Sequence, residues 1–383
     1  MYHLFIINPY AFKNRHGLRS TIASKINYTL SRLRISDDMF SVHFSRFPRD
    51  AVGVVKNRRA ELPEDVTLRV YAVGGDGIVF DCLNGIVGQK NTQLALLPYG
   101  KRNVFASSFG NSSLSCFRNL DLIVAAESTV SVDVIKSGNT YSLSELNFGL
   151  RSAAFFEVSA LEETLSIFGS FLRHLLMKRS YYLAERIAFF KGSENNRRYG
   201  VEIDGEDLGG NYANILVMNL QPHTKDRRRK SALCDFSVTD GCFDVLLLKG
   251  SAYMHPLRSM LLLESYDKWH FGGKSKKESI IYRRGKSIDI TSPSGQLITV
   301  STDGEAHYDI AYAAEILPGG VEIAVPKEIF SSFKMHRKTN RPAVMPDNGT
   351  AGSVNSVNSA NSVNSADSVN SVNPVNSEIK KPV

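Results

Sequence analysis

The stretch Leu68–Gly77, which reads Leu-Arg-Val-Tyr-Ala-Val-Gly-Gly-Asp-Gly, decides the fold of this chain. Its mostly apolar first six residues predict a buried strand over Leu68–Val73. The glycines permit a tight turn, and the residues after it predict a helix over 78–87. Free N–H groups at the start of such a helix bind phosphate, and Asp76 adds a carboxylate that can contact a metal ion or a sugar hydroxyl. The same pattern also makes an ordinary strand-to-helix connection, so the neighbouring motifs must decide between the two interpretations.

Strand and helix patterns alternate through the first third of the chain. Strands are expected at Leu4–Ile7, Phe40–Phe44, Leu68–Val73 and Leu94–Leu97, and helices at Leu18–Leu33, Pro48–Arg59, Ile78–Val87 and Val104–Phe109. This alternation predicts an α/β domain with a doubly wound parallel sheet over residues 1–128. Ligands of such sheets bind beyond the carboxyl ends of the strands, where the loops at Asn8, Gly74 and Gly100 would converge.

The pattern changes near Ser128, where short strand-like stretches separated by turn signals begin. We expect a second, β-rich antiparallel domain over residues 129–314, interrupted by a helical segment over Leu161–Phe190. Its strands are expected at Val130–Ile135, Tyr141–Phe148, Val201–Ile203, Asn214–Leu220, Phe243–Leu248, Ser287–Thr291 and Leu297–Val300. From about Arg341 the chain is rich in Pro, Gly, Asn and Ser and repeats Ser-Val-Asn, which predicts a disordered low-complexity tail over 341–383.

The charge of the chain favours anionic partners. Lysine and arginine number 46 against 38 acidic residues, a net charge of +8. This excess suits a nucleic acid, a phosphorylated small molecule or an acidic membrane surface. The densest basic clusters are Lys225–Lys230, Lys274–Lys277 and Arg283–Lys286. A nucleic-acid partner is disfavoured, because the sequence contains no recognition helix and no aromatic-and-basic sheet motif.

Cysteine spacing and hydropathy indicate where in the cell the protein is expected. The four cysteines lack paired-ligand spacing, so no zinc site is predicted. The amino terminus reads as a first strand rather than a signal peptide, and no stretch approaches the roughly 18 apolar residues of a membrane span. We therefore expect a cytoplasmic protein that visits a membrane surface.

The order of several short motifs resembles the diacylglycerol kinase catalytic family, which includes bacterial lipid kinases and is related to sphingosine and ceramide kinases. The resemblance covers roughly residues 1 to 335. The motifs are Ile7–Pro9, Val73–Gly77 with Asn84-Gly85 in the following helix, Leu97–Ala106, Asn147–Gly149, Val217–Asn219, Thr239–Asp244 and Thr302–Glu305. Each motif alone is weak, whereas the ordered set is specific.

The resemblance implies a nucleotide-binding α/β domain joined to a β-rich lipid-substrate domain, with a segment at about 315–338 returning to the first domain. It also implies transfer of the γ-phosphoryl group of ATP, with Mg²⁺, to the hydroxyl of a diacylglycerol or sphingoid lipid. Such an enzyme would act as a peripheral protein at the membrane surface, where the basic clusters would contact anionic lipid.

The resemblance also implies the catalytic residues. Asp303 matches the base that accepts the proton of the attacking hydroxyl, and Glu305 would assist the metal or orient Asp303. The alternative is that Asp303-Gly304 only turns a hairpin, because Asp-Gly is a common hairpin signal. A second Asp-Gly-Glu stands at Asp204–Glu206. The later copy is favoured, because it follows a predicted strand and lies downstream of Asp240-Gly241.

Further positions match the nucleotide and metal sites of the family. The nucleotide-binding positions are Asn8, Gly74, Gly75, Asp76, Gly77, Gly100, Lys101 and Asn103. The metal positions are Asp76, on the nucleotide side, and Asp240, which matches a structural Mg²⁺ site of bacterial members.

The chain also departs from the family pattern at positions where chemistry is expected. Ile78 replaces the usual threonine, Lys101 and Arg102 replace small residues, and Val104 replaces an aspartate of diacylglycerol kinases. Three functions therefore stay open. The first is a lipid kinase, the second is a catalytically impaired relative that binds lipid or nucleotide as a sensor or scaffold, and the third is a soluble-substrate kinase related to NAD kinases.

Overall fold

In the computed structural model, the amino-terminal part of the chain forms a parallel sheet. Its strands lie in the order β2 (Phe40–Phe44), β1 (Tyr2–Ile7), β3 (Leu68–Gly74) and β4 (Thr92–Pro98), and all neighbours are parallel. All residues of β1 and β3 are buried. Such continuous burial is typical of a parallel sheet with helices on both faces.

The structure describes residues 1–12, 16–100, 103–109, 113–165, 184, 187–188, 191, 196–220, 238–250 and 280–330. These residues belong to one compact unit, Met1–Pro342. Lys101, Arg102, the predicted tail from residue 341 and the predicted helical segment beyond residue 165, apart from a few positions, lie outside the described residues.

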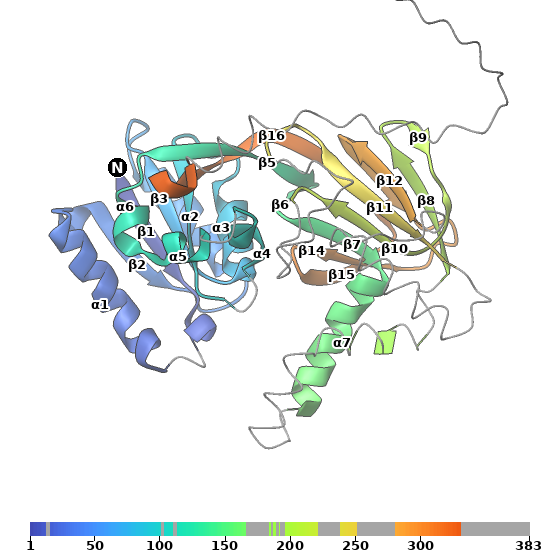
Figure 1. Ribbon diagram of the computed structural model, residues 1–383, viewed down its shortest axis with the longest axis horizontal. Helices are drawn as coiled ribbons and strands as arrows, with labels where there is room; N and C mark the ends of the chain where they lie inside the picture. The colour runs from blue at the N-terminus through green and yellow to red at the C-terminus, as the bar shows by residue number, and fades with distance from the viewer. Residues whose placement is uncertain are drawn as a thin grey trace, which may run out of the picture. The chain divides into compact units, whose positions relative to one another are not determined.

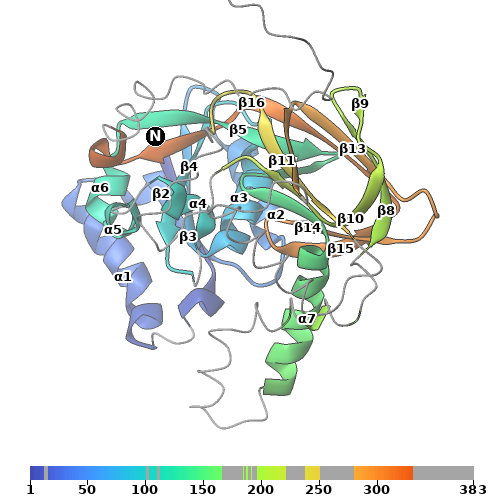
Figure 2. The same cartoon turned by 45° about the vertical axis from the view of Figure 1, so that its right-hand side comes forward.

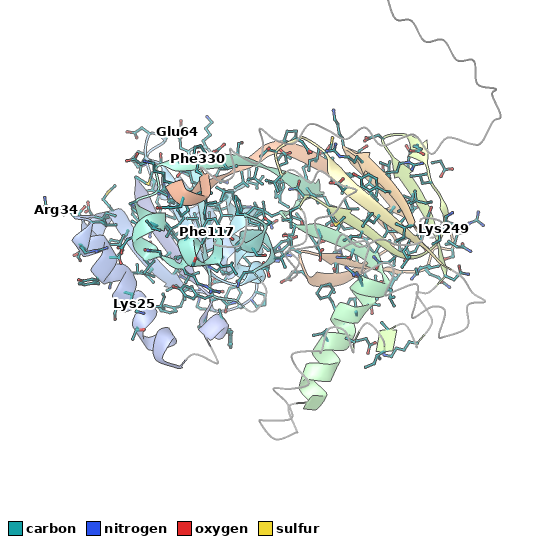
Figure 3. All side chains as sticks on the ribbon, viewed as in Figure 1. Lys25, Arg34, Glu64, Phe117, Lys249 and Phe330 are labelled. Atoms are coloured by element: carbon teal, nitrogen blue, oxygen red, sulfur yellow. The ribbon has the colours of Figure 1, made fainter. Side chains whose placement is uncertain are left out.

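Helices cover both faces of the parallel sheet (Figures 1 and 2). They are η1 (Pro9–Phe12), α1 (His16–Arg32), η2 (Asp37–Met39), α2 (Asp50–Glu61), α3 (Asp76–Ile86), α4 (Val104–Ser108), α5 (Ser113–Arg118) and α6 (Leu120–Val124). The helices α1, α5 and α6 lie on one face, and α2 and α3 lie on the other. Phe117 of α5 is fully buried in this core, whereas Lys25 of α1 is exposed (Figure 3).

The rest of the described chain is rich in strands. They are β5 (Ser128–Ser137), β6 (Thr140–Ser142), β7 (Glu145–Gly149), β8 (Arg197–Ile203), β9 (Glu206–Asp207), β10 (Gly210–Met218), β11 (Phe243–Lys249), β12 (Ile280–Gly285), β13 (Ser287–Thr291), β14 (Ile298–Thr302), β15 (Glu305–Asp309) and β16 (Ala311–Val325). The pairings among β5 to β15 are antiparallel. Helix α7 (Leu150–Leu165) follows β7. An α/β part followed by a β-rich antiparallel part confirms the predicted fold class.

The long strand β16 belongs to both parts of the molecule. Its first half pairs antiparallel with β13, and its second half lies parallel to β4. A register shift between Leu317 and Val321 separates the two halves where β16 pairs with β5. The described strands therefore form one connected sheet, in which the parallel and antiparallel regions meet at β16. None of the described helices is both long and apolar enough to cross a membrane.

The single strand expected over Tyr141–Phe148 is wrong. The structure has two strands, β6 and β7, which are interrupted at Leu143 and Ser144. The interruption has a physical cause, because the N–H groups of Leu143, Ser144 and Glu145 donate to the side chain of Asp303. A local pattern does not contain this partner, which lies about 160 residues away along the chain.

Asn84 connects the helical part to the β-rich part. Its Nδ2 donates to the carbonyl of Tyr141 at 2.9 Å, and the N–H of Tyr141 donates to its Oδ1 at 2.9 Å. Nδ2 also donates to the carbonyl of Phe80, one turn earlier in α3. The amide thus binds the backbone of β6 in the way that a neighbouring strand would, and it fixes α3 against β6.

Replacement of Asn84 by alanine is expected to lower the melting temperature of the full chain. The partly buried N–H and carbonyl groups of Tyr141 would both lose the Asn84 side chain as a partner, which costs up to about 1–3 kcal/mol for each group left unsatisfied. Thermal unfolding followed by circular dichroism measures the change. The matched control is Asn27→Ala on the exposed face of α1, which should leave the melting temperature nearly unchanged. Equal melting temperatures for Asn84→Ala and the wild type would contradict the proposed connection.

Candidate functional site

The glycine-rich turn between β3 and α3 is tightly packed. A Cβ atom on Gly74 would lie 2.8 Å from Cγ2 of Ile78, and one on Gly75 would lie 3.2 Å from Cα of Gly100. Ile78 itself is 2% exposed and belongs to the core. The residue that replaces the family's threonine therefore packs beneath the turn, and its side chain has no hydroxyl to offer to a phosphate.

The loop after β4 lies directly against this turn. The N–H groups of Tyr99 and Gly100 both donate to the carbonyl of Gly74, at 2.8 and 2.9 Å. A Cβ atom on Gly100 would lie only 2.3 Å from Cα of Gly75. The cavity between the two loops measures about 10 Å³, the size of a single water at most. Gly75 and Gly100 thus allow the two backbones to approach closely at the carboxyl edge of the sheet, whereas Gly74 leaves room for Ile78 and Asn8.

The two predicted asparagines shape their own loops. Asn8 accepts a hydrogen bond from the N–H of Tyr10 at 2.9 Å. Asn103, whose φ is +54°, accepts from the N–H of Gly100 at 2.9 Å and donates to its carbonyl at 2.8 Å. Asparagine tolerates the left-handed conformation better than most residues, which explains its place at position 103. Both side chains hold the edge of the site in shape.

Asp76 stands in the first turn of α3, where the free N–H groups of the helix favour negative charge. Its Oδ1 accepts a hydrogen bond of 2.7 Å from the N–H of Val104, at the start of α4. Position 104, where the family has an aspartate side chain, therefore contributes through its backbone. This bond joins the glycine turn to the second loop.

Asp303 lies in the turn between β14 and β15, with φ of +50°, followed by Gly304 at +92°. Its carboxylate accepts four hydrogen bonds, from the hydroxyl of Ser142 at 2.7 Å and from the N–H groups of Leu143, Ser144 and Glu145 at 2.9 Å each. Burial raises the pKa of Asp303 to about 6, against the lowering effect of these hydrogen bonds. The carboxylate fixes the hairpin to the segment between β6 and β7.

The earlier Asp-Gly-Glu copy forms a hairpin of the same kind in different surroundings. Asp204 also has a positive φ, +48°, and its carboxylate accepts from the N–H groups of Lys286 and Ser287. Glu206 there forms an ion pair with Arg283 at 2.9 Å. Both copies therefore form hairpin turns. They differ in their surroundings, because Asp303 binds the segment that follows Tyr141, and Tyr141 is hydrogen-bonded to Asn84 of α3.

Glu305 is exposed at the start of β15. Burial raises the pKa of Asp81 on α3 against the hydrogen bond from Arg49, and the charge of Glu305 raises it further. The charge of Glu305 therefore acts on a carboxylate in the second turn of α3. Asp76, one turn earlier on that helix, and Glu305 thus border the same region of the molecule.

Arg49 and Asp81 also border this region, although the sequence reasoning did not include them. Arg49 has a φ of +69°, its N–H donates to Asp81 Oδ2 at 3.0 Å, and its guanidinium lies 4.2 Å from the centre of the Phe80 ring. A non-glycine residue in this conformation costs about 1–3 kcal/mol, which makes it a marker of functional regions. The only local signal is Pro48-Arg-Asp50 at a helix start, which does not predict a positive φ.

The metal positions differ in their surroundings. Asp76 suits a Mg²⁺ ion bound together with phosphate, because its carboxylate stands at a helix N-terminus beside the glycine turn. Asp240 instead forms an ion pair with Arg284 at 2.5 Å. Within the described ranges, no group of three or more His, Cys, Asp or Glu side chains has the geometry to hold a metal. Because Arg284 already supplies a positive charge beside Asp240, the residues present there do not fit a metal ion.

Of the three basic clusters, only Arg283–Lys286 lies within the described residues. Arg283 pairs with Glu206, and Arg284 pairs with Asp240. Internal carboxylates thus neutralise both arginines, so contact of this cluster with anionic lipid stays a prediction.

Comparison with known proteins gives matches to diacylglycerol kinases. Residues 3–137 match the model of the diacylglycerol kinase catalytic domain. The chain is 25% identical over 274 residues to a diacylglycerol kinase of Staphylococcus epidermidis, which covers 70% of this chain and 78% of that protein. A diacylglycerol kinase of Staphylococcus haemolyticus is 24% identical over 266 residues, 68% of this chain and 72% of that protein.

Solved structures share the fold. A Bacillus anthracis structure described as a diacylglycerol kinase has a TM-score of 0.54 at 17% identity and covers 86% of this chain and 98% of its own. Another from the same organism reaches a TM-score of 0.60 at 19% identity with the same coverage. Residues 3–137 thus match the diacylglycerol kinase catalytic domain, and the chain shares the fold of these solved structures.

Replacement of Gly100 by alanine is expected to separate the two loops, because the new Cβ would lie 2.3 Å from the backbone of Gly75. We expect a lower melting temperature and loss of ATP binding, measured by thermal unfolding and isothermal titration calorimetry. Gly77→Ala is the matched control for folding, because a Cβ there meets no atom within 4 Å and alanine favours the helix. A Gly100→Ala variant with wild-type stability and ATP affinity would contradict the described packing.

Proposed function

We propose that this protein is an ATP-dependent lipid kinase that transfers the γ-phosphoryl group to the hydroxyl of a diacylglycerol or sphingoid lipid at a membrane surface. The observation that carries the proposal is the connection from α3 through Asn84 and Tyr141 to the hairpin of Asp303. It joins the hairpin that contains Glu305 to the helix that begins at the glycine turn, which supports a site shared by a carboxylate base and a phosphate-binding element. The relatives named diacylglycerol kinases support this choice of reaction.

In the proposed reaction, the oxygen of the lipid hydroxyl forms a bond to the γ-phosphorus while the bond from that phosphorus to the bridging oxygen of ADP breaks. The glycine turn and the N-terminus of α3 bind the phosphates, and Asp76 would hold the Mg²⁺ ion. When bound, Mg²⁺ supplies positive charge that offsets the charge of the phosphate oxygens. Positioning and charge neutralisation account for most of the catalysis in such transfers.

Glu305 is the group that takes the proton of the attacking hydroxyl in this proposal. Asp303, the base that the sequence favoured, already accepts four hydrogen bonds and serves better as a positioning residue. Glu305 is exposed at the start of the adjoining strand, and its charge acts on Asp81 of α3. We therefore exchange the two roles predicted from the sequence.

A catalytically impaired relative is the second candidate. It is favoured by Ile78, whose buried side chain stands where the family has a phosphate-contacting hydroxyl, and by Asp76, whose Oδ1 accepts from the backbone of Val104. Such a protein would bind ATP or lipid without turnover. A soluble-substrate kinase is the third, and an assay with NAD as acceptor separates it from the lipid kinase.

The proposed function is tested by transfer of labelled γ-phosphate from ATP with Mg²⁺ to a panel of acceptors in mixed micelles. The panel contains diacylglycerol, sphingoid bases, ceramide and phosphatidylglycerol, with NAD as the soluble control. We expect label in one lipid. Label in NAD alone would support the soluble-substrate kinase, and ATP or lipid binding without transfer would support the impaired relative.

The roles of the two hairpin carboxylates are separated by Glu305→Gln and Asp303→Ala. We expect Glu305→Gln to lower kcat by about 10²–10⁴-fold, the usual contribution of a general base, with an unchanged melting temperature. Asp303→Ala is expected to lower both activity and melting temperature, because three backbone N–H groups and Ser142 lose their acceptor. Full activity in Glu305→Gln, together with an inactive and stably folded Asp303→Ala, would return the base role to Asp303.

A further inference from the structure

Three carboxylates and one arginine surround the turn that precedes β11. Asp133 comes from β5, Asp240 from the turn itself, Asp244 from β11 and Arg284 from β12. The family resemblance places a structural metal at Asp240. The contacts of these side chains show how the charge is balanced in this chain.

Both oxygens of the Asp133 carboxylate accept hydrogen bonds from the backbone. Asp133 is 3% exposed, and the donors are the N–H of Gly241 at 2.7 Å and the N–H of Gly319 at 2.8 Å. These bonds tie the turn before β11 to the bulge of β16. Backbone donors therefore satisfy this carboxylate.

Asp244 is a buried carboxylate on β11. It is also 3% exposed, so its charge requires a close partner. Tyr282 donates a hydrogen bond to it, and Arg284, its direct neighbour across the β11–β12 pair, has Nε 3.6 Å from its Oδ1. Arg284 thus supplies the positive charge that this buried carboxylate faces.

The same guanidinium also binds Asp240. One of its terminal nitrogens lies 2.5 Å from Oδ2 of Asp240, while Oδ1 of that residue accepts from the N–H of Cys242 at 3.2 Å. Arginine keeps its charge at any physiological pH, and its planar head has donors pointing in several directions. One side chain therefore contacts two carboxylates that come from the turn and from the strand after it.

We propose that Arg284 is a built-in cation that takes the place of the structural metal at Asp240, so that the β-rich part of this protein folds and is stable without a divalent ion. The proposal concerns stability alone and stands whether or not the protein is a lipid kinase. It follows that Mg²⁺ would be required only for nucleotide binding and transfer, at Asp76, and not for the stability of the β-rich part.

The test is the melting temperature of the full chain in excess EDTA and in millimolar Mg²⁺. The wild type should melt at the same temperature in both. Arg284→Gln should melt about 3–6 °C lower in EDTA, because Asp244 keeps a buried charge without its partner. Mg²⁺ should recover part of that loss, since a divalent ion can occupy the vacated place between the carboxylates, and adding Asp240→Asn should abolish the recovery.

The matched control is Arg283→Gln, the adjacent arginine on the same strand. Its ion pair with Glu206 is solvent-exposed, so its loss should change the melting temperature little in either solution. A control that falls as far as Arg284→Gln would overturn the special role of Arg284. So would a wild type that melts lower in EDTA and recovers with Mg²⁺, or an Arg284→Gln variant with wild-type stability.

A second variant keeps the proposal testable if Arg284→Gln does not fold. Arg284→Gln combined with Asp244→Asn removes the buried charge together with its partner, so the double variant should fold in EDTA and be more stable than the single one. A double variant that folds only with added Mg²⁺ would overturn the proposal.

Discussion

The carboxylate of Asp303 is the interaction on which the arrangement of the candidate site depends. Its four hydrogen bonds interrupt what would otherwise be one strand, fix the segment from Ser142 to Glu145, and set the direction of the β14–β15 hairpin. Because Tyr141, directly before that segment, is bonded to Asn84, the hairpin and α3 have a fixed relation. Glu305 acquires its position through these contacts.

The close approach of two loops is the second constraint. Gly74 and Gly75 meet the loop of Gly100 backbone to backbone, and any side chain at position 100 would collide with Gly75. Asp76 and Asn103 then bond across or within these loops. The motif glycines are thus required by the packing between the loops as well as by any phosphate that approaches them. The same short motif therefore contributes to the fold and to the candidate site.

The charges of the β-rich part are balanced within the fold. The arginines of β12 face carboxylates at Glu206, Asp240 and Asp244, so the positive charge counted from the sequence is largely neutralised at this place. A cluster of basic residues in a sequence therefore says little about partners until the acidic residues beside it in space are known. The same contacts provide an internal cation at Asp240.

The alternation of strands and helices, the glycine turn at Gly74 and the change to antiparallel strands near Ser128 could be predicted from local periodicity. The resemblance to diacylglycerol kinases could be predicted from the order of short motifs. Three features became visible only in the folded chain. They are the break between β6 and β7, the left-handed conformation of Arg49 beside Asp81, and the different surroundings of Asp204 and Asp303. The same holds for the contact of Arg284 with Asp240. Each of these depends on partners distant in sequence, since hydrogen bonding and charge pairing in a folded chain follow spatial neighbours, which local patterns do not specify.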